Sequence, residues 1–167
     1  MDPPARMENL VRHTDAGGIQ CCLHAIGDRA HAEALELYAR VGGNRAPSRR
    51  FRMEHAQHVR PGDFARFARL GVVASMQPYH AADDGRRAEK RLGPQRARTS
   101  YAWRSMLRAG VPLAFGSDWP VAPLAPLQGI RAAVTRRTLG GKHSQGWVPE
   151  ERLTVEEAVR AYTVGSA

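Results

Sequence analysis

The chain has 167 residues and a mass of 18.4 kDa, which is enough for one domain and too little for a large closed barrel of roughly 250 residues. With 43% hydrophobic and 25% charged residues, its composition is that of a folded α/β or α+β protein, and disorder is excluded for most of its length. No stretch approaches the ~20 consecutive apolar residues of a membrane span, and the N-terminus lacks the basic start and apolar centre of a secretory signal. We therefore expect a cytoplasmic protein without a membrane partner.

The chain is basic, with a formal net charge of +9 and an isoelectric point near 10.7, which raises the question of a nucleic-acid partner. Only Lys90 and Lys142 are lysines, so 23 of the 25 basic residues are arginines, and they are spread over nearly every segment. The densest cluster consists of Arg86, Arg87, Lys90, Arg91, Arg96 and Arg98. Acidic residues interrupt this cluster, and no aromatic side chains for base stacking are interleaved with it. We interpret it as a solvated or substrate-facing loop and expect no nucleic-acid partner.

Short apolar runs alternate with helical patterns along the chain. The predicted helices cover residues 3–16, 28–41, 61–70, 99–109, 126–139 and 154–162. The predicted strands cover residues 18–24, 50–55, 71–77 and 111–118, and a long polar loop follows the third strand. Thr154 and Glu157 form a capping-box pattern before the last helix. Because parallel neighbouring strands need crossover connections, this order of elements predicts a parallel sheet.

Two cysteines, Cys21 and Cys22, are adjacent in the first apolar run. Adjacent cysteines build neither a disulfide framework nor a CxxC metal site. We expect both to be buried thiols of a protein in a reducing compartment.

Polar residues end three of the predicted strands. His24 ends the first, His55 the second and Asp118 the fourth. Because the carboxyl ends of parallel strands face the ligand, we expect these side chains to converge on one face. Two imidazoles and a carboxylate suit a borderline divalent ion such as zinc. The alternative is that each is an isolated polar residue where a loop begins.

Several segments resemble the metal-dependent amidohydrolase superfamily, and they cover almost the whole chain in the family's order. They are most similar to the branch with N-substituted formamide deformylases and exoenzyme-regulatory hydrolases. The segments are HAIGDRA (24–30), RMEHAQ (52–57), SMQP (75–78), RLGPQRARTSYAWRSMLRAGVPLAFGSDWPV (91–121) and LTVEEAVRAYTVGSA (153–167). The resemblance implies a TIM-like (β/α)8 barrel. It matches His24 and His55 to the metal-binding histidines after strands 5 and 6, and Asp118 to the aspartate after strand 8, which acts on the nucleophilic water.

The chain also departs from the family pattern. It contains no His-x-His pair of the kind that members carry on the first strand, and neither Lys90 nor Lys142 is placed to be a carboxylated lysine. No strands of the family's small β-sandwich follow the last helix. Residues 1–167 are therefore interpreted as a partial barrel domain, strands 5 to 8 with their helices, without the N-terminal half-barrel or the sandwich.

A half-barrel should leave part of its surface uncovered. Four strands cut from a closed barrel have two free edges. We expect Val, Leu, Met and Phe side chains to be exposed along the inner face of the sheet. Self-association through that face is the expected consequence.

Four further residues are candidates for substrate binding. Asp28 either orients His24 or binds substrate, although its position also suits a helix N-cap. Tyr79 and His80 begin the long loop after the third strand, where substrate contacts and a surface role are equally compatible with the sequence. Trp119 either forms a wall of the pocket or covers the barrel rim.

The resemblance and the strand-end residues together predict a hydrolase for C–N bonds of a small amide or formamide-like substrate. A metal-activated water would attack, and Asp118 would take its proton and pass it to the leaving nitrogen. With half of the metal site, residues 1–167 alone are expected to be inactive. The alternatives are a non-enzymatic fragment or assembly partner and, third, an arginine-rich nucleic-acid binder whose affinity falls steeply with salt.

Overall fold

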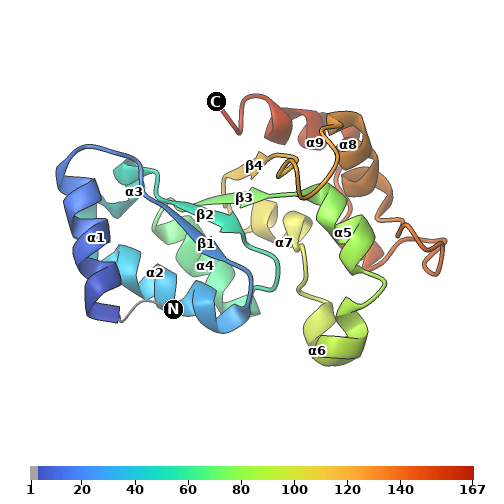
Figure 1. Cartoon of the computed structure of the whole chain (residues 1–167), viewed down its shortest axis with the longest axis horizontal. Helices are drawn as coiled ribbons and strands as arrows, with labels where there is room; N and C mark the ends of the chain where they lie inside the picture. The colour runs from blue at the N-terminus through green and yellow to red at the C-terminus, as the bar shows by residue number, and fades with distance from the viewer. Residues whose placement is uncertain (1–3) are drawn as a thin grey trace.

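Four short strands form a parallel sheet in the order β1-β2-β3-β4 in the computed structural model, which describes residues 4–167 (Figure 1). The strands are β1 (Cys22–Ala25), β2 (Arg52–His55), β3 (Val73–Met76) and β4 (Leu113–Phe115). All neighbouring pairs are parallel, so the four carboxyl ends lie along one edge of the sheet. The predicted parallel α/β sheet is confirmed.

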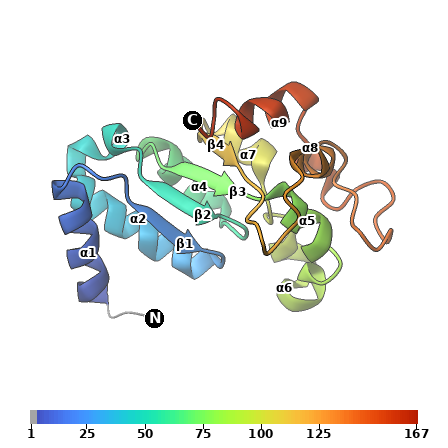
Figure 2. The same cartoon turned by 45° about the horizontal axis from the view of Figure 1, so that its top comes forward.

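Helices pack against the sheet and around its two ends. They are α1 (Pro4–Ala16), α2 (Asp28–Gly42), α3 (Ala46–Arg49), α4 (Pro61–Arg69), α5 (Pro78–Asp84), α6 (Ala88–Ala97), α7 (Trp103–Arg108), α8 (Pro126–Thr135) and α9 (Val155–Tyr162). Two short 3₁₀ turns, η1 (Gly43–Arg45) and η2 (Pro149–Glu151), complete the order. Figure 2 shows α2 and α4 behind β1, β2 and β3, whereas α5 and α8 lie beyond the carboxyl ends of the strands and α9 packs beside β4. Within residues 4–167, no helix is both long and apolar enough to cross a membrane.

The two faces of the sheet differ in polarity. Met53 and Ala74 are fully buried against the helices, in register with each other across β2 and β3. The opposite face carries Arg52, Glu54 and Ser75, where the Arg52 guanidinium donates to the Glu54 carboxylate and, at 2.7 Å, to Ser75 Oγ. The expectation of exposed Val, Leu, Met and Phe side chains along this inner face is wrong, because Arg52, Glu54 and Ser75 there are polar and hydrogen-bonded, and Val73 on the same face is only 6% exposed.

The element boundaries depart from the sequence prediction where local backbone geometry ends a periodic pattern. Every strand is shorter than predicted, and Cys22 is exposed on β1 rather than buried like Cys21. The predicted polar loop after β3 is instead α5 and α6, of which α6 bends at Gly93 (φ 77°) and lacks a continuous apolar stripe. The capping box of Thr154 and Glu157 is confirmed at the start of α9. Pro3, the predicted first residue of the first helix, lies outside the described residues.

A buried arginine joins the segments around α7 and α8. Arg136 is 3% exposed and donates to the carbonyl oxygens of Trp147 and Tyr101 at 2.8 Å and of Ser100 at 3.2 Å. Its guanidinium carbon lies 4.5 Å from the centre of the Trp103 ring. Burial lowers the pKa of Arg136 to about 10, and the nearby Glu151 carboxylate raises it in part. All this makes Arg136 a structural cross-link.

Candidate metal centre

The carboxyl edge of the sheet carries residues in an uncommon backbone conformation. His55 (φ 76°), Ala56 (φ 43°) and Asp118 (φ 58°) all have positive φ, which is rare for residues other than glycine. Such conformations cost on the order of 1–3 kcal/mol each and cluster at functional sites. At His55, this conformation ends β2 and redirects a side chain that strand alternation would place with Met53 on the helix side.

Three side chains meet at this edge. His55, at the end of β2, His80, in α5, and Asp118, after β4, each offer one ligand atom, and these atoms lie within 4.8 Å of one another. His80 Nε2 is 3.7 Å from Asp118 Oδ2, and the rings of His55 and His80 are stacked with centroids 6.1 Å apart. The His80 Nε2 atom is buried without a hydrogen-bond partner.

Electrostatics favour the neutral, metal-binding form of His80. Burial lowers the pKa of His80 below its usual value of 6.5, an effect that the Asp118 carboxylate only partly offsets. A neutral imidazole keeps a lone pair on one nitrogen, which a divalent cation can use. His55 is held by a hydrogen bond of 2.9 Å between its Nδ1 and Oε1 of Gln77.

The structure brings together two of the three residues expected to converge, His55 and Asp118. His24 is on the exposed face of β1, and its ring packs edge-on against His55 with a centroid distance of 4.4 Å. It is outside the group of three whose ligand atoms lie within 4.8 Å of one another. His24 therefore stays a predicted ligand next to the cluster, and His80, expected only as a substrate contact, joins the donor set.

The remaining candidates lie away from this cluster or at its margin. Asp28 accepts hydrogen bonds from the Arg29 amide at 2.8 Å and from Arg96 at 2.9 Å. Gly27, not Asp28, is the N-cap of α2, so the predicted capping role is wrong. Trp119, after β4, is 67% exposed, and Tyr79 is half-buried beside His80 in α5.

Asp28 instead lines a small cavity of about 230 Å³ beside α6, together with His58 and Arg96. Burial raises the pKa of Asp28, but the Arg29 amide and the Arg96 guanidinium outweigh it and lower the pKa below its usual 3.8. The carboxylate is thus engaged in an ion pair that fastens α6 to the start of α2.

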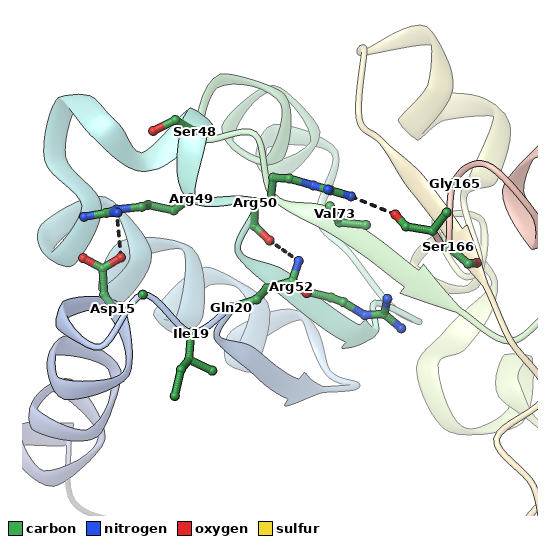
Figure 3. A pocket seen from close by; sticks show the side chains of 12 residues that line it. Asp15, Ile19, Gln20, Ser48, Arg49, Arg50, Arg52, Val73, Gly165 and Ser166 are labelled. Atoms are coloured by element: carbon green, nitrogen blue, oxygen red, sulfur yellow. Dashed lines mark hydrogen bonds and ion pairs between the residues drawn. The ribbon is translucent and has the colours of Figure 1, made fainter.

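A larger hollow lies at the opposite end of the strands (Figure 3). It has a volume of about 380 Å³, and its lining includes Arg49, Arg50 and Arg52. The Arg49 guanidinium pairs with Asp15 at 2.8 Å, and Arg50 donates to the carbonyl of Ala167 at 3.1 Å. Its lining shares no residue with the cluster of His55, His80 and Asp118.

Two residues that support the carboxyl edge were not singled out from the sequence. His31, fully buried in α2, has its Nε2 2.9 Å from the carbonyl oxygen of Ala25, which ends β1, and its Nδ1 3.1 Å from that of His58, which follows β2, and its neutral ring donates to one of the two. Gln77 follows β3 directly, so the rule that singled out His55 and Asp118 could also have found it.

Comparisons with known proteins give the family and the fold of this chain. A model of the Amidohydrolase family matches residues 1–167. The chain is 43% identical over 166 residues to Protein LONG AFTER FAR-RED 3 of Arabidopsis thaliana and 30% identical over 164 residues to the N-substituted formamide deformylase of Arthrobacter pascens. Each alignment covers 98% of this chain but only 28% and 30% of those relatives.

Solved structures extend the likeness to the fold. An uncharacterised metal-dependent hydrolase from Pyrococcus horikoshii OT3 superposes with a TM-score of 0.89 at 27% identity, over the whole chain and 33% of that structure. The four parallel strands with their helices therefore form half of a TIM-like (β/α)8 barrel, as expected. The matched family and the shared fold together place this chain in the amidohydrolase family.

Proposed function

We propose that this chain supplies part of the active site of a hydrolase that cleaves C–N bonds in small amide or formamide-like substrates. The proposal rests above all on the approach of His55, His80 and Asp118 to within 4.8 Å at the carboxyl edge of the sheet. The likeness to an N-substituted formamide deformylase supports the class of bond. The chain spans less than a third of the length of its curated relatives, so the activity belongs to an assembly larger than residues 1–167.

The donor set fits a divalent ion, and we propose zinc. Two imidazoles and a carboxylate are ligands that zinc accepts, and a three-residue site leaves a fourth position open. Among residues 4–167, the buried Nε2 of His80 has no hydrogen-bond partner, which is costly unless a ligand occupies the site. His24 lies beside the cluster as a further imidazole, in contact with His55.

The chain's own residues divide the chemistry between them. When bound, the ion would polarise the substrate carbonyl and lower the pKa of the attacking water. Asp118, with its side chain 33% exposed, is accessible to take the proton of that water and pass it to the leaving nitrogen. His80 stays neutral because it is partly buried, and His55 is oriented by Gln77.

Ion pairs neutralise part of the positive charge of the arginine-rich segment. This supports our proposal that the chain has no nucleic-acid partner. Its ion pairs are Arg86 and Arg87 with Asp83, Arg96 with Asp28, and Arg98 with Glu150. These contacts keep guanidinium groups engaged within the protein, in a segment that is helical and interspersed with acidic residues. The partner we propose is a small-molecule amide.

We propose that residues 1–167 alone have negligible activity. A complete set of ligands positions the reacting water, and a displacement of about 1 Å can cost on the order of a hundredfold in rate. The family resemblance places a His-x-His pair on a first strand that is outside this sequence. Supplying a half that carries that pair, on the same or another chain, should restore turnover.

A chimaera tests this proposal. The matching segment of the Arthrobacter pascens enzyme is replaced by residues 1–167, and hydrolysis of N-substituted formamides and N-acyl amino acids is measured with zinc. We expect turnover by the chimaera, none by the isolated chain, and loss of turnover on Asp118→Asn. Turnover by the isolated chain that Asp118→Asn abolishes would overturn the expected inactivity. An Asp118→Asn chimaera as active as its parent would remove Asp118 from the mechanism.

A further inference from the structure

Gln77 occupies the position directly after β3, between two of the candidate metal ligands. Its side chain belongs to a residue only 5% exposed, and its Oε1 lies 2.9 Å from Nδ1 of His55. Leaving a buried polar group without its hydrogen bond is costly, so this contact is favoured in the folded chain.

The chemistry of this contact determines the tautomer of His55. A carboxamide oxygen only accepts hydrogen bonds, so Nδ1 of His55 must carry the proton and donate it. A neutral imidazole has one N–H, which leaves Nε2 as the nitrogen with a free lone pair. Nε2 is then the atom with which His55 can bind a cation.

The main chain of Gln77 acts on a second ligand. Gln77 is the N-cap of α5, and its carbonyl oxygen accepts a hydrogen bond of 3.0 Å from the amide of His80. This bond closes the turn that presents His80 to Asp118. One residue thus contacts His55 through its side chain and His80 through its backbone.

We propose that Gln77 is a positioning residue of the metal site, which holds His55 with Nδ1 protonated and Nε2 free to bind. This inference rests on the proposed function, because it takes the binding of a divalent ion as the role of this tautomer. Partners that fix a ligating histidine in this way commonly contribute 10–100-fold to metal affinity. The effect acts through His55, and Gln77 itself is not a catalytic residue.

The first test reads the tautomer in the metal-free protein. Long-range ¹H–¹⁵N spectra are recorded for wild type, Gln77→Leu and Gln77→Glu, with the His55 signals assigned by their loss in His55→Ala. We expect Nδ1–H in wild type and in Gln77→Glu, whose carboxylate also accepts, and loss of that preference in Gln77→Leu. Wild-type His55 protonated on Nε2 would overturn the proposal, because the amide would then donate rather than accept.

A matched control separates this effect from the loss of a buried glutamine. Gln57 is similarly buried, at 8% exposed, but its amide donates to the Tyr101 hydroxyl at 2.6 Å, whereas the Gln77 side chain accepts from the candidate ligand His55. Gln57→Leu should leave the His55 tautomer unchanged. Urea unfolding of every variant shows which of them are folded, and Gln77→Glu keeps the test decisive where Gln77→Leu does not fold.

The second test measures zinc affinity of the same variants. We expect Gln77→Leu to weaken binding 10–100-fold and Gln77→Glu and Gln57→Leu to stay near wild type. Unchanged affinity of folded Gln77→Leu, with binding lost in His55→Ala, would overturn the role of Gln77 and leave the proposed function standing. If wild type binds no zinc, the proposed function fails, while the tautomer spectra still decide what Gln77 does to His55.

Discussion

The Arg136 guanidinium and the cluster of His55, His80 and Asp118 at the carboxyl edge are both polar, but the guanidinium is fully hydrogen-bonded, whereas the buried Nε2 of His80 has no hydrogen-bond partner among residues 4–167. The Arg136 guanidinium uses all three of its nitrogen atoms on main-chain carbonyls and packs between Trp103 and Trp147. The positive φ of His55 and Asp118 does not distinguish the two regions, because Arg136 (φ 55°) and Tyr101 (φ 51°) share it. A fully hydrogen-bonded guanidinium holds the fold, whereas a buried His80 nitrogen without a partner, close to two other potential ligands, marks a place for a ligand.

The difference has an energetic counterpart. Removing a group from a satisfied network leaves buried partners unpaired, which lowers the free energy of unfolding. Removing a group that has no hydrogen-bond partner breaks no hydrogen bond within the protein. It changes ligand binding instead. Stability and metal affinity should therefore respond to different residues.

Arg136→Met should have the largest effect on stability. The substitution leaves the buried carbonyls of Ser100 and Trp147 without a donor and removes one of the two donors to the Tyr101 carbonyl, at a cost of about 3 kcal/mol in unfolding free energy. Urea denaturation measures it, and Arg137→Met, at an exposed neighbouring position, is the control. A loss no larger than that of the control would mean that the cluster is not a structural cross-link.

His31 should make stability depend on pH. Burial lowers its pKa from 6.5 to about 4, against the raising effect of the Ala25 and His58 carbonyls. As the pH falls through 6.5, the unfolded chain takes up this proton first, so stability is full above 6.5 and about 3 kcal/mol is lost by pH 4.

The control for this prediction removes the titrating ring. His31→Gln should flatten the slope of unfolding free energy between pH 6.5 and 4, leaving the smaller contributions of His58 and His80, whose pKa values burial also lowers. His13→Gln, at an exposed position, should keep the wild-type slope. An unchanged slope in His31→Gln would contradict the assignment to His31.

Asp118→Asn should have the smallest effect on stability. Asparagine tolerates the positive φ of 58° at this position, and the change removes no hydrogen bond within the described chain that supports the fold. We expect a change in unfolding free energy within about 0.5 kcal/mol, measured in metal-free protein. A loss of unfolding free energy as large as that of Arg136→Met would show that Asp118 stabilises the fold, as Arg136 does. It would contradict the difference that we draw between the two clusters.

The sequence predicts the elements that have strong local signals. Thr154 and Glu157 form the capping box that the pattern indicates, and alternation of strands with helices is enough to predict the parallel sheet. The strand-end rule correctly places His55 and Asp118 at one edge. These features depend on local chemistry or on chain order, both of which a single sequence contains.

Other features depend on contacts that form only in the fold. His80 joins the site because α5 starts at Pro78, directly after β3, in a segment whose polar composition was interpreted as a loop. In a sequence, glycine is the usual sign of a positive φ, and position 55 is a histidine. The positive φ of His55, and the side-chain direction that follows from it, could therefore not be predicted. On the inner face, Arg52 hydrogen-bonds with Glu54 and also with Ser75 of the neighbouring strand, which is distant in sequence, so these bonds come together only in the fold.

Zinc binding by metal-free protein tests the central claim most directly, namely that His55, His80 and Asp118 form a divalent-metal site. Equilibrium dialysis is carried out on wild type, His80→Ala, Asp118→Asn and, as a control, His13→Ala. Losing a ligand should cost more than the 10–100-fold expected for a supporting residue, so we predict saturable binding by wild type and the control and more than a hundredfold weaker binding by the two site variants. Wild-type affinity in His80→Ala, or no saturable binding by wild type, would contradict the account.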